Sequence, residues 1–327
     1  MRRSAAGLRQ RQQGAAILTA MLTVVLVATL TATALWQQWR GVEIEAAQRT
    51  RLQSAWVLTG ALDWARLILR EDGRKGGADH LAEPWAVPLE QARLSTFLAA
   101  DRSDTLAAEA AQSAFLSGRI TDLQSRLNVI NLVQGGQVHA PSLRAFTRLF
   151  DLLGLPRREL SALASNLQLA QGGSSGRSPA LVPNAPLWPQ EMAQLAWYGL
   201  SPRSLALLQD FVTLLPGSTP VNLNTAPVEV VYACLEAFEL ADAHRLVAAR
   251  KAAHFTSLDD VAKANGSGLL KLDFAQHSVA SRFFEVRGRL QIEQDIVEEY
   301  SLVQREAAEV RTLWRRRGSL PPMANLQ

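Results

Sequence analysis

The stretch AAILTAMLTVVLVATLTATALW, which runs from Ala15 to Trp36, determines how the rest of the chain is read, because it contains no charged residue. At about 1.5 Å per helical residue it is roughly 33 Å long, enough to cross the hydrocarbon core of a bilayer. Arginines precede the stretch, so the positive-inside rule keeps the N-terminus in the cytoplasm. The sequence therefore predicts one transmembrane helix over 15–36, with most of the chain on the far side of the lipid bilayer.

The helical pattern continues past this segment into an arm over residues 37–72. Apolar residues recur there every three or four positions and form one stripe along a helix: Leu52, Ala55, Leu58, Leu62, Ala65 and Leu69. Asp72-Gly73 and then Gly76-Gly77 are typical of a helix end. We therefore expect the arm to end at Asp72-Gly73.

Composition indicates a folded protein and gives no sign of a nucleic-acid-binding surface. Of the 327 residues, 48% are hydrophobic and 20% are charged, which is ordinary for a globular protein. The formal net charge of +4 comes from the N-terminus, which carries Arg2, Arg3, Arg9 and Arg11. Without these arginines, basic and acidic residues balance at 30 each. The positive charge thus belongs to the cytoplasmic end of the membrane helix and not to a phosphate-binding face.

The cysteine and histidine content argues against a disulfide framework and against a tight metal site. Cys234 is the only cysteine, so the chain cannot form an internal disulfide. The histidines are scattered and none falls in an HExxH or related spacing: His80, His139, His244, His254 and His277. We therefore predict no metal and no cofactor.

Periodicity divides the rest of the chain into a helical block between two blocks of strands. Residues 113–133 and 282–297 alternate and are rich in β-branched side chains, and 309–317 fits a final strand. The block at 142–275 has helical spacing, and 192–215 is a further helical stretch within it. One helical face of the block is formed by Phe146, Leu149, Phe150, Leu153 and Leu163.

A glycine- and proline-rich segment interrupts the helical block and contains a formal G-x-S-x-G match. The match, Gly172-Gly-Ser-Ser-Gly176, is centred on Ser174 and is followed by Pro179 and Pro183. A nucleophile elbow needs a buried strand before the serine and a helix after it. Here the serine lies between a polar segment and prolines, so we interpret it as part of a loop. An anchored periplasmic hydrolase stays an alternative that lacks a recognisable base and orienting group.

The most specific internal motif is Thr219-Pro-Val-Asn-Leu-Asn-Thr-Ala-Pro-Val-Glu-Val-Val, which precedes a run of short helices. Thr225 is a candidate N-cap of the first helix, and Glu229 complements its positive end. A second helix is expected over 241–252. A third should begin at Ser257-Leu-Asp-Asp260, which has the pattern of a capping box.

This helical module is similar to those of helix-hairpin-helix DNA-binding proteins, so a membrane-anchored DNA-binding protein of the competence type is another alternative. Such hairpins use a glycine-rich turn whose backbone amides hold a phosphate. The corresponding turn at 237–240 has no glycine, and segment 220–265 carries six acidic residues against four basic ones. A surface with that balance is a poor phosphate binder. We interpret the module as a protein-interaction scaffold and predict no nucleic-acid partner.

The junction Arg11-Gln-Gln-Gly-Ala-Ala-Ile-Leu18 resembles the prepilin peptidase site of type IV pilin-like proteins. The resemblance implies that cleavage after Gly14 removes a leader of residues 1–14 and that Ala15 becomes the methylated mature N-terminus. Most such proteins have Glu at the fifth mature position, where this chain has Thr19. That carboxylate can neutralise the N-terminal amine of a neighbouring subunit, and K-type minor pseudopilins lack it. The resemblance thus makes Thr19 a candidate determinant of a place at the filament tip.

Internal motifs extend the resemblance to K-type minor pseudopilins of bacterial type II secretion systems (the GspK family) over essentially the whole chain. The N-x-N-T-A module at 222–226 and the S-R-x-F-x-V stretch at 281–286 follow in the family's order. An earlier G-x-I-x-D-x-x-x-R-x-N stretch, with a further asparagine shifted by one residue, is matched by Gly118, Ile120, Asp122, Arg126, Asn128 and Asn131.

The resemblance implies an α+β fold: a long N-terminal transmembrane helix and a pilin-like domain of a helix and an antiparallel sheet, with a large inserted all-α domain. After the helical arm, the pilin-like domain would begin at 73–141. An insertion of SAM-like or helix-hairpin-helix-like type would occupy 142–275. The C-terminal strands of the pilin-like domain would follow at 276–327.

The resemblance further implies a structural role and no enzymatic activity. The protein would be a minor pseudopilin of the tip complex that initiates and caps the periplasmic pseudopilus, through which folded proteins are exported across the outer membrane. The implied partners are the I- and J-type minor pseudopilins, prepilin peptidase, the inner-membrane secretion platform and the lipid bilayer. The implied location is the inner membrane, single-pass, with the N-terminus in the cytoplasm and the C-terminal domain in the periplasm.

One feature of the family is missing. Members usually carry an acidic D-W-x-D-x-D stretch after the first helices of the inserted domain. The matching place at 164–171 reads ASNLQLAQ and has no carboxylate. Calcium needs several oxygen ligands, preferably anionic ones. The sequence therefore does not support the family's calcium site at this place.

Overall fold

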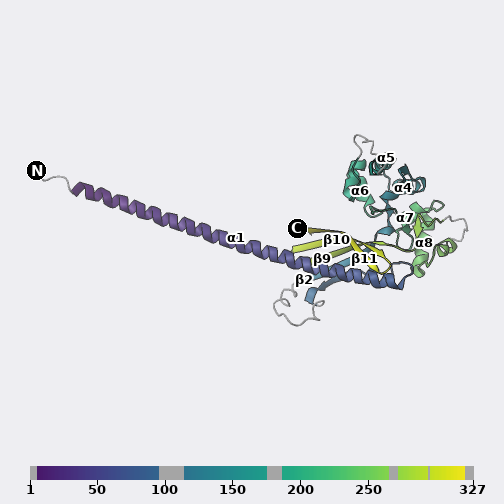
Figure 1. Cartoon of the computed structure of the whole chain (residues 1–327), viewed down its shortest axis with the longest axis horizontal. Helices are drawn as coiled ribbons and strands as arrows, with labels where there is room; N and C mark the ends of the chain where they lie inside the picture. Colours follow the sequence, from purple (N-terminus) through teal and green to yellow (C-terminus); the bar gives the residue numbers. More distant parts are fainter. Residues whose placement is uncertain (1–5, 96–113, 175–185, 265–271, 294, 321–327) are drawn as a thin grey trace. The chain divides into compact units, whose positions relative to one another are not determined.

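The computed structural model (Figure 1) describes residues 6–95, 114–174, 186–264, 272–293 and 295–320. The chain divides into two compact units, Met1–Val57 and Leu58–Gln327. The described part of the first unit is helical throughout, and the second unit contains the sheet and the remaining helices.

Helix α1, Ala6–Lys75, contains the predicted transmembrane segment. Within the described residues it is the one helix that is long and apolar enough to cross a membrane, judged by length and composition. Its threonines are accommodated because their hydroxyls bond back to carbonyls three or four residues earlier. Thr31 donates to the Val27 carbonyl and Thr33 to the Thr29 carbonyl, both at 2.7 Å. The predicted helix over 15–36 is therefore present.

The end of α1 lies further along the chain than the sequence predicted. We expected Asp72-Gly73 to end the helix, but α1 continues through Gly73 to Lys75. It stops at Gly76 and Gly77, which have φ angles of 65° and 114°. Glycine adopts such positive φ angles without strain. Gly73 is required for another reason, since a Cβ there would lie 2.1 Å from the carbonyl oxygen of Ala307. The missing side chain lets the helix approach the backbone at Ala307.

Replacing Gly73 by alanine should destabilise the second unit, although alanine favours helix. The added methyl group would collide with the Ala307 backbone, and overpacking of this kind costs about 1–3 kcal/mol. Gly60→Ala is the matched control, because nothing lies within 4 Å of its added Cβ, and it should stabilise the helix by about 0.5–1 kcal/mol. Chemical denaturation followed by tryptophan fluorescence should show shifts of opposite sign. Equal shifts would contradict the close approach at Gly73.

The second unit contains a five-stranded antiparallel sheet with the strand order β1-β2-β9-β10-β11. Its strands are β1 (Leu89–Arg93), β2 (Ala114–Asp122), β9 (Phe283–Ile292), β10 (Asp295–Glu306) and β11 (Glu309–Leu320). The predicted strands at both ends of the helical block are therefore present, and β2 pairs directly with β9 across that block.

The C-terminal part of α1 packs on one face of this sheet through the predicted apolar stripe. Leu62, Ala65 and Leu69 are buried in one cluster with Phe284 of β9. Trp85, from the short 3-10 helix η1 (Pro84–Ala86), joins the cluster and meets Phe284 edge to face, with the ring centroids 5.1 Å apart. This helix-on-sheet packing is the arrangement that the resemblance implied.

Between β2 and β9 lies a set of helices that we call the helical region (123–280), and Figure 1 shows its helices gathered together. In chain order these helices are η2 (Leu123–Ser125), η3 (Val129–Leu132), α4 (Ala140–Leu152), α5 (Arg157–Ser174), η4 (Met192–Tyr198), α6 (Pro202–Leu208), α7 (Val228–Cys234), α8 (Leu240–Ala252) and α9 (Leu258–Ala264). Short strand pairs link them: β3 (Leu127–Asn128) with β6 (Val212–Thr213), β4 (Val133–Gln134) with β5 (Gln137–Val138), and β7 (Val221–Asn222) with β8 (His277–Ser278).

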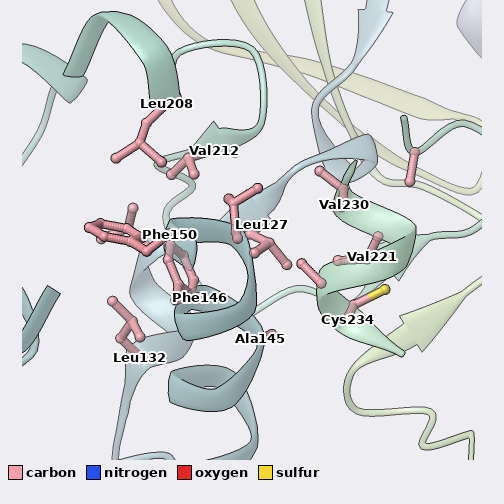
Figure 2. Packing of buried hydrophobic residues seen from close by; sticks show 14 of the residues in the cluster. Leu127, Leu132, Ala145, Phe146, Phe150, Leu208, Val212, Val221, Val230 and Cys234 are labelled. Atoms are coloured by element: carbon pink, nitrogen blue, oxygen red, sulfur yellow. The ribbon is translucent and has the colours of Figure 1, made fainter. Parts of the chain in front are cut away.

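One hydrophobic cluster holds the helical region together (Figure 2). Phe146 and Phe150 of α4 are almost completely buried in it, together with Leu208 of α6 and Val230 of α7. The cluster reaches back to Leu127, which precedes residue 142, the predicted start of the insertion. The domain limits drawn from the sequence stay a prediction.

Two secondary-structure predictions were wrong in part. Only the first half of 113–133 forms a long strand, β2, and the second half consists mainly of 3-10 turns. The side chains of Asp122 and Asn128 each accept a hydrogen bond from the backbone N–H two residues ahead, which offers the backbone an alternative to a strand ladder. Likewise 192–215 is not one helix but η4, α6 and strand β6, because Gly199, at a φ of 102°, ends η4.

Candidate functional site

A buried polar cluster around Asp122 joins the sheet to the helical region. The Asp122 side chain is 2% exposed. Its carboxylate accepts hydrogen bonds from the Gln124 N–H (2.7 Å), the Asn222 side-chain amide (3.1 Å), and the hydroxyls of Thr225 and Ser281 (both 2.6 Å). Burial raises the pKa of Asp122 to about 6, against these donors, which favour the charged form. We call this group the Asp122 cluster.

The Asp122 cluster unites motifs that lie far apart in the sequence. Asp122 belongs to the G-x-I-x-D stretch, Asn222 and Thr225 to the N-x-N-T-A module, and Ser281 to the S-R-x-F stretch. We expected Thr225 to cap α7, but Pro227 occupies that position and the Thr225 hydroxyl donates to Asp122 instead. The three internal motifs of the family resemblance therefore meet at one structural junction.

Two asparagines reinforce this junction from the helical region. The Asn128 amide donates to the Gly217 carbonyl at 2.7 Å and to the Thr219 hydroxyl at 3.0 Å. The Asn131 amide donates to the Thr219 carbonyl at 2.7 Å. Together these bonds hold the start of the Thr219 motif against the turns that follow β2.

Three carboxylates gather beside the end of α1, although no motif predicted them. Oxygens of Asp72, Asp79 and Glu83 lie within 4.8 Å of one another. The buried guanidinium of Arg305, from β10, is hydrogen-bonded to both Asp72 and Asp79 and also donates to the Ser281 carbonyl at 3.0 Å. A protein cation is thus already part of the group, so we interpret it as an internal ion-pair network and not as a metal site.

Glu83 is the titratable member of this group. Burial raises its pKa to about 7, because hydrogen bonds from the His80 N–H and the Trp85 indole only partly offset the loss of hydration. The His80 ring stacks on His254 of the helical region, with centroids 3.7 Å apart, and burial, with a smaller effect of His254, lowers the pKa of His80. The segment after α1 therefore contains two groups, Glu83 and His80, that change charge at or below neutral pH.

Glu83 should make the protein less stable as the pH rises. A carboxyl group whose pKa is raised on folding stabilises the fold below its unfolded pKa, near 4.5, and this contribution is lost as the pH rises through about 7. Glu83→Gln removes the titration and keeps an oxygen that can accept the two hydrogen bonds. The melting temperature of the wild type minus that of Glu83→Gln should fall between pH 5 and pH 8. A difference that is flat or rises between these pH values would contradict a raised pKa for Glu83.

The predicted processing site lies within continuous helix, since Gly14 and Ala15 are both inside α1. The Thr19 side chain is exposed, and its hydroxyl donates to the carbonyls of Ala15 at 3.1 Å and Ala16 at 3.0 Å. Thr19 thus bonds to its own helix and offers no negative charge to a neighbouring amine. The roles predicted for these residues in cleavage, methylation and tip placement stay predictions.

An arginine of the same chain, Arg148, binds the backbone of the turn between α7 and α8. The Arg148 guanidinium, from α4, donates to the carbonyls of Tyr232 (3.0 Å), Glu236 (3.2 Å) and Phe238. It also lies over the Tyr232 ring, 4.0 Å from the centroid. The hairpin thus presents carbonyls to an internal arginine, and this geometry favours a scaffold over a phosphate-binding turn.

The predicted helix at 241–252 is confirmed as α8, and the capping box Ser257–Asp260 forms at the start of α9.

The place that would match the family's calcium stretch does not fit a calcium ion. Residues 164–171 belong to α5, and Ala164, Leu167 and Ala170 are buried in the helical region. This part of the helix supplies apolar packing and no carboxylate, whereas calcium needs several oxygen ligands.

The surroundings of Ser174 and of Cys234 do not fit a catalytic nucleophile. Ser174 is the last residue of α5, so a helix precedes it where a nucleophile elbow needs a strand. Residues 172–174, which we predicted to be part of a loop, are therefore helical, and Gly176, Pro179 and Pro183 lie outside the described residues. Cys234 is buried, and burial raises the pKa of its thiol to about 12, which leaves it unreactive at neutral pH.

Comparisons with known proteins point to one family. Residues 125–217 and 221–280 match the family described as Type II secretion system (T2SS), protein K. The Type II secretion system protein K of Pseudomonas aeruginosa is 28% identical over 299 residues, which cover 85% of this chain and 84% of that protein. A chain in the crystal structure of the GspK-GspI-GspJ complex from enterotoxigenic Escherichia coli has the same fold. Its TM-score is 0.62 at 17% identity, over 83% of this chain and 98% of that chain.

Proposed function

We propose that this chain, which belongs to the type II secretion system protein K family, is a minor pseudopilin in the complex at the tip of the pseudopilus. In that position it would help to initiate the filament and would cap it. The filament in turn serves the export of folded proteins across the outer membrane. The role is structural and includes no catalytic step.

The order of parts along the chain is the observation that carries this proposal. An apolar helix of membrane-spanning length continues as α1 onto an antiparallel sheet, and the helical region is inserted between β2 and β9. A chain of this fold occurs in the complex of GspK with GspI and GspJ. Minor pseudopilins of the I and J types are therefore the partners that we propose.

Two features support the tip over the body of the filament. Thr19 offers no carboxylate for the N-terminal amine of a subunit stacked above it. The helical region also adds well over a hundred residues to a small helix-and-sheet domain. Neighbours related by a small axial step along a thin filament would collide at such an insertion. A subunit with nothing above it has neither difficulty.

The membrane location follows from the same proposal. Prepilin peptidase would remove residues 1–14, the helix over 15–36 would lie in the inner membrane, and the secretion platform would contact the protein there. The region from 37 onward, including the pilin-like parts at 73–141 and 276–327 and the insertion at 142–275, would lie in the periplasm. The N-terminal arginines on the other side of the span support this orientation.

Processing at Gly14 tests the assignment. Intact-mass spectrometry of the membrane form should show Ala15, carrying an N-methyl group, as the first residue. Gly14→Ile should leave the leader attached, because a bulky side chain replaces the small residue after which the peptidase cuts. Gly7→Ile, inside the leader, is the matched control and should be processed normally. A mature chain that begins at Met1, or one cut after residue 30, would contradict the pilin-like assignment.

A further inference from the structure

The face of the sheet opposite α1 carries a transverse row of arginines. Helix α1 packs on the face that bears Phe284. Because side chains alternate along a strand, Arg287 of β9 points to the opposite face. The register places Arg119 of β2 beside Arg287, Arg287 beside Tyr300 of β10, and Tyr300 beside Arg316 of β11. At a strand spacing of about 4.8 Å the row is roughly 14 Å long.

Arg289 lies next to this row, two residues along β9, and we call the whole set the arginine face: Arg119, Arg287, Arg289 and Arg316, with Tyr300 among them. The helical region packs on one end of this face and also reaches Arg316 through Glu191. At that end, Phe283 and Leu302 are buried against Leu123 and Leu215. Beyond that end, Arg119 is exposed, and 55% of the Arg316 side chain is accessible.

Carboxylates balance the positive charges of this face only in part, and one of them, Glu285, lies on the same face two residues before Arg287 on β9. Glu298 is 5% exposed and pairs with Arg287 at 2.8 Å and with Arg289 at 3.9 Å, so two cations share one buried carboxylate. Arg316 pairs with Glu191 of the helical region. The Tyr300 hydroxyl donates to Glu298 at 2.7 Å, which helps to hold that carboxylate in place.

Arg119 has no such partner. In the part of the chain that the structure describes, its guanidinium forms neither an ion pair nor a hydrogen bond, and the residue stands directly opposite Arg287 on the neighbouring antiparallel strand. Like charges in that position destabilise a sheet. The Arg119–Arg287 pair does not stabilise the fold. A locally destabilising arrangement with no structural benefit is typical of a binding surface.

We propose that the arginine face docks an acidic segment of a neighbouring subunit, an inference that rests on the proposed function. Guanidinium groups bind carboxylates through two parallel hydrogen bonds, and arginine and tyrosine are enriched in protein interfaces. A nucleic-acid backbone fits less well, because it needs a run of free cations. Here Glu298 and Glu191 already bind three of the four arginines, which leaves a surface of mixed charge.

The test measures how tightly the full chain, purified in detergent, binds the I- and J-type minor pseudopilins. Arg119→Glu should raise the dissociation constant by about tenfold or more at low salt. The loss should shrink at high salt, because exposed charges are screened. Arg203→Glu is the matched control. Arg203 is exposed at the start of α6 and, within the described residues, has no ion pair, so reversing its charge should leave binding unchanged.

Unfolding would not explain a loss of binding, because Arg119→Glu replaces a repulsive cross-strand pair by an attractive one. Its melting temperature should equal or exceed that of the wild type. A wild-type chain that fails to bind the pseudopilins would contradict the proposed function. A wild type that binds, with Arg119→Glu binding equally tightly, would overturn the arginine face alone. Duplex DNA bound by the wild type and lost in Arg119→Glu, with pseudopilin binding unchanged, would assign the face to nucleic acid and also overturn the proposal.

Discussion

Replacing Asp122 by alanine should destabilise the second unit by about 3–5 kcal/mol, because it removes the acceptor of four buried hydrogen bonds. Folded domains are stable by only about 5–15 kcal/mol in total, so the variant should retain only a small part of the wild-type stability. Urea denaturation of the full chain in detergent, followed by tryptophan fluorescence, measures the loss. The pull-down of other minor pseudopilins should fail with it.

Asp151→Ala is the matched control for this experiment. Asp151 also accepts hydrogen bonds from an arginine, Arg157 at 2.6 and 2.7 Å, but both side chains lie on the surface. Exposed ion pairs contribute little to stability, so the control should unfold almost as the wild type does. Equal losses for Asp122→Ala and Asp151→Ala would show that the Asp122 cluster does not hold the sheet and the helical region together.

Local periodicity was enough to predict the elements that bury a regular stripe. Leu62, Ala65 and Leu69 lie on the sheet as the spacing indicated, and α8 forms where its helical spacing predicted. The capping box at Ser257 and Asp260 is equally local, since both of its hydrogen bonds form within four residues. Such features depend on neighbours in the sequence, so one sequence contains the information needed to find them.

The junctions depend on contacts between distant residues and could not be predicted in this way. Gly73 lies inside α1 although a glycine after an aspartate is typical of a helix end, and the close approach of Ala307, far along the chain, leaves no room for a side chain there. Thr225 is a residue type that often caps helices, but its hydroxyl donates a hydrogen bond to the buried carboxylate of Asp122 instead. Arg305 and the carboxylates near the end of α1 belong to no motif at all. In each case a tertiary contact overrides the local preference.

Loss of this protein should abolish type II secretion, because the tip complex could no longer start a pseudopilus. A deletion strain should retain the secreted enzymes in its periplasm, and the wild-type gene supplied in trans should restore export. A chain with Gly14→Ile should fail to restore export, because an uncleaved leader keeps the subunit out of the filament. The readout is the ratio of secreted to periplasmic enzyme activity. Normal secretion by the deletion strain would contradict the proposed role.

We expect the protein to be found at only one end of each filament. Immunogold labelling of pseudopili should place it at one tip of each filament, since the helical region would collide with its copies along the shaft. Thr19→Glu should be tolerated or mildly harmful and should not move the protein into the shaft. The new carboxylate would have no subunit above it to neutralise, and an unpartnered charge at membrane depth costs about 2.5–3.5 kcal/mol. Even labelling along the filaments, or better secretion with Thr19→Glu, would show that this subunit repeats within the shaft.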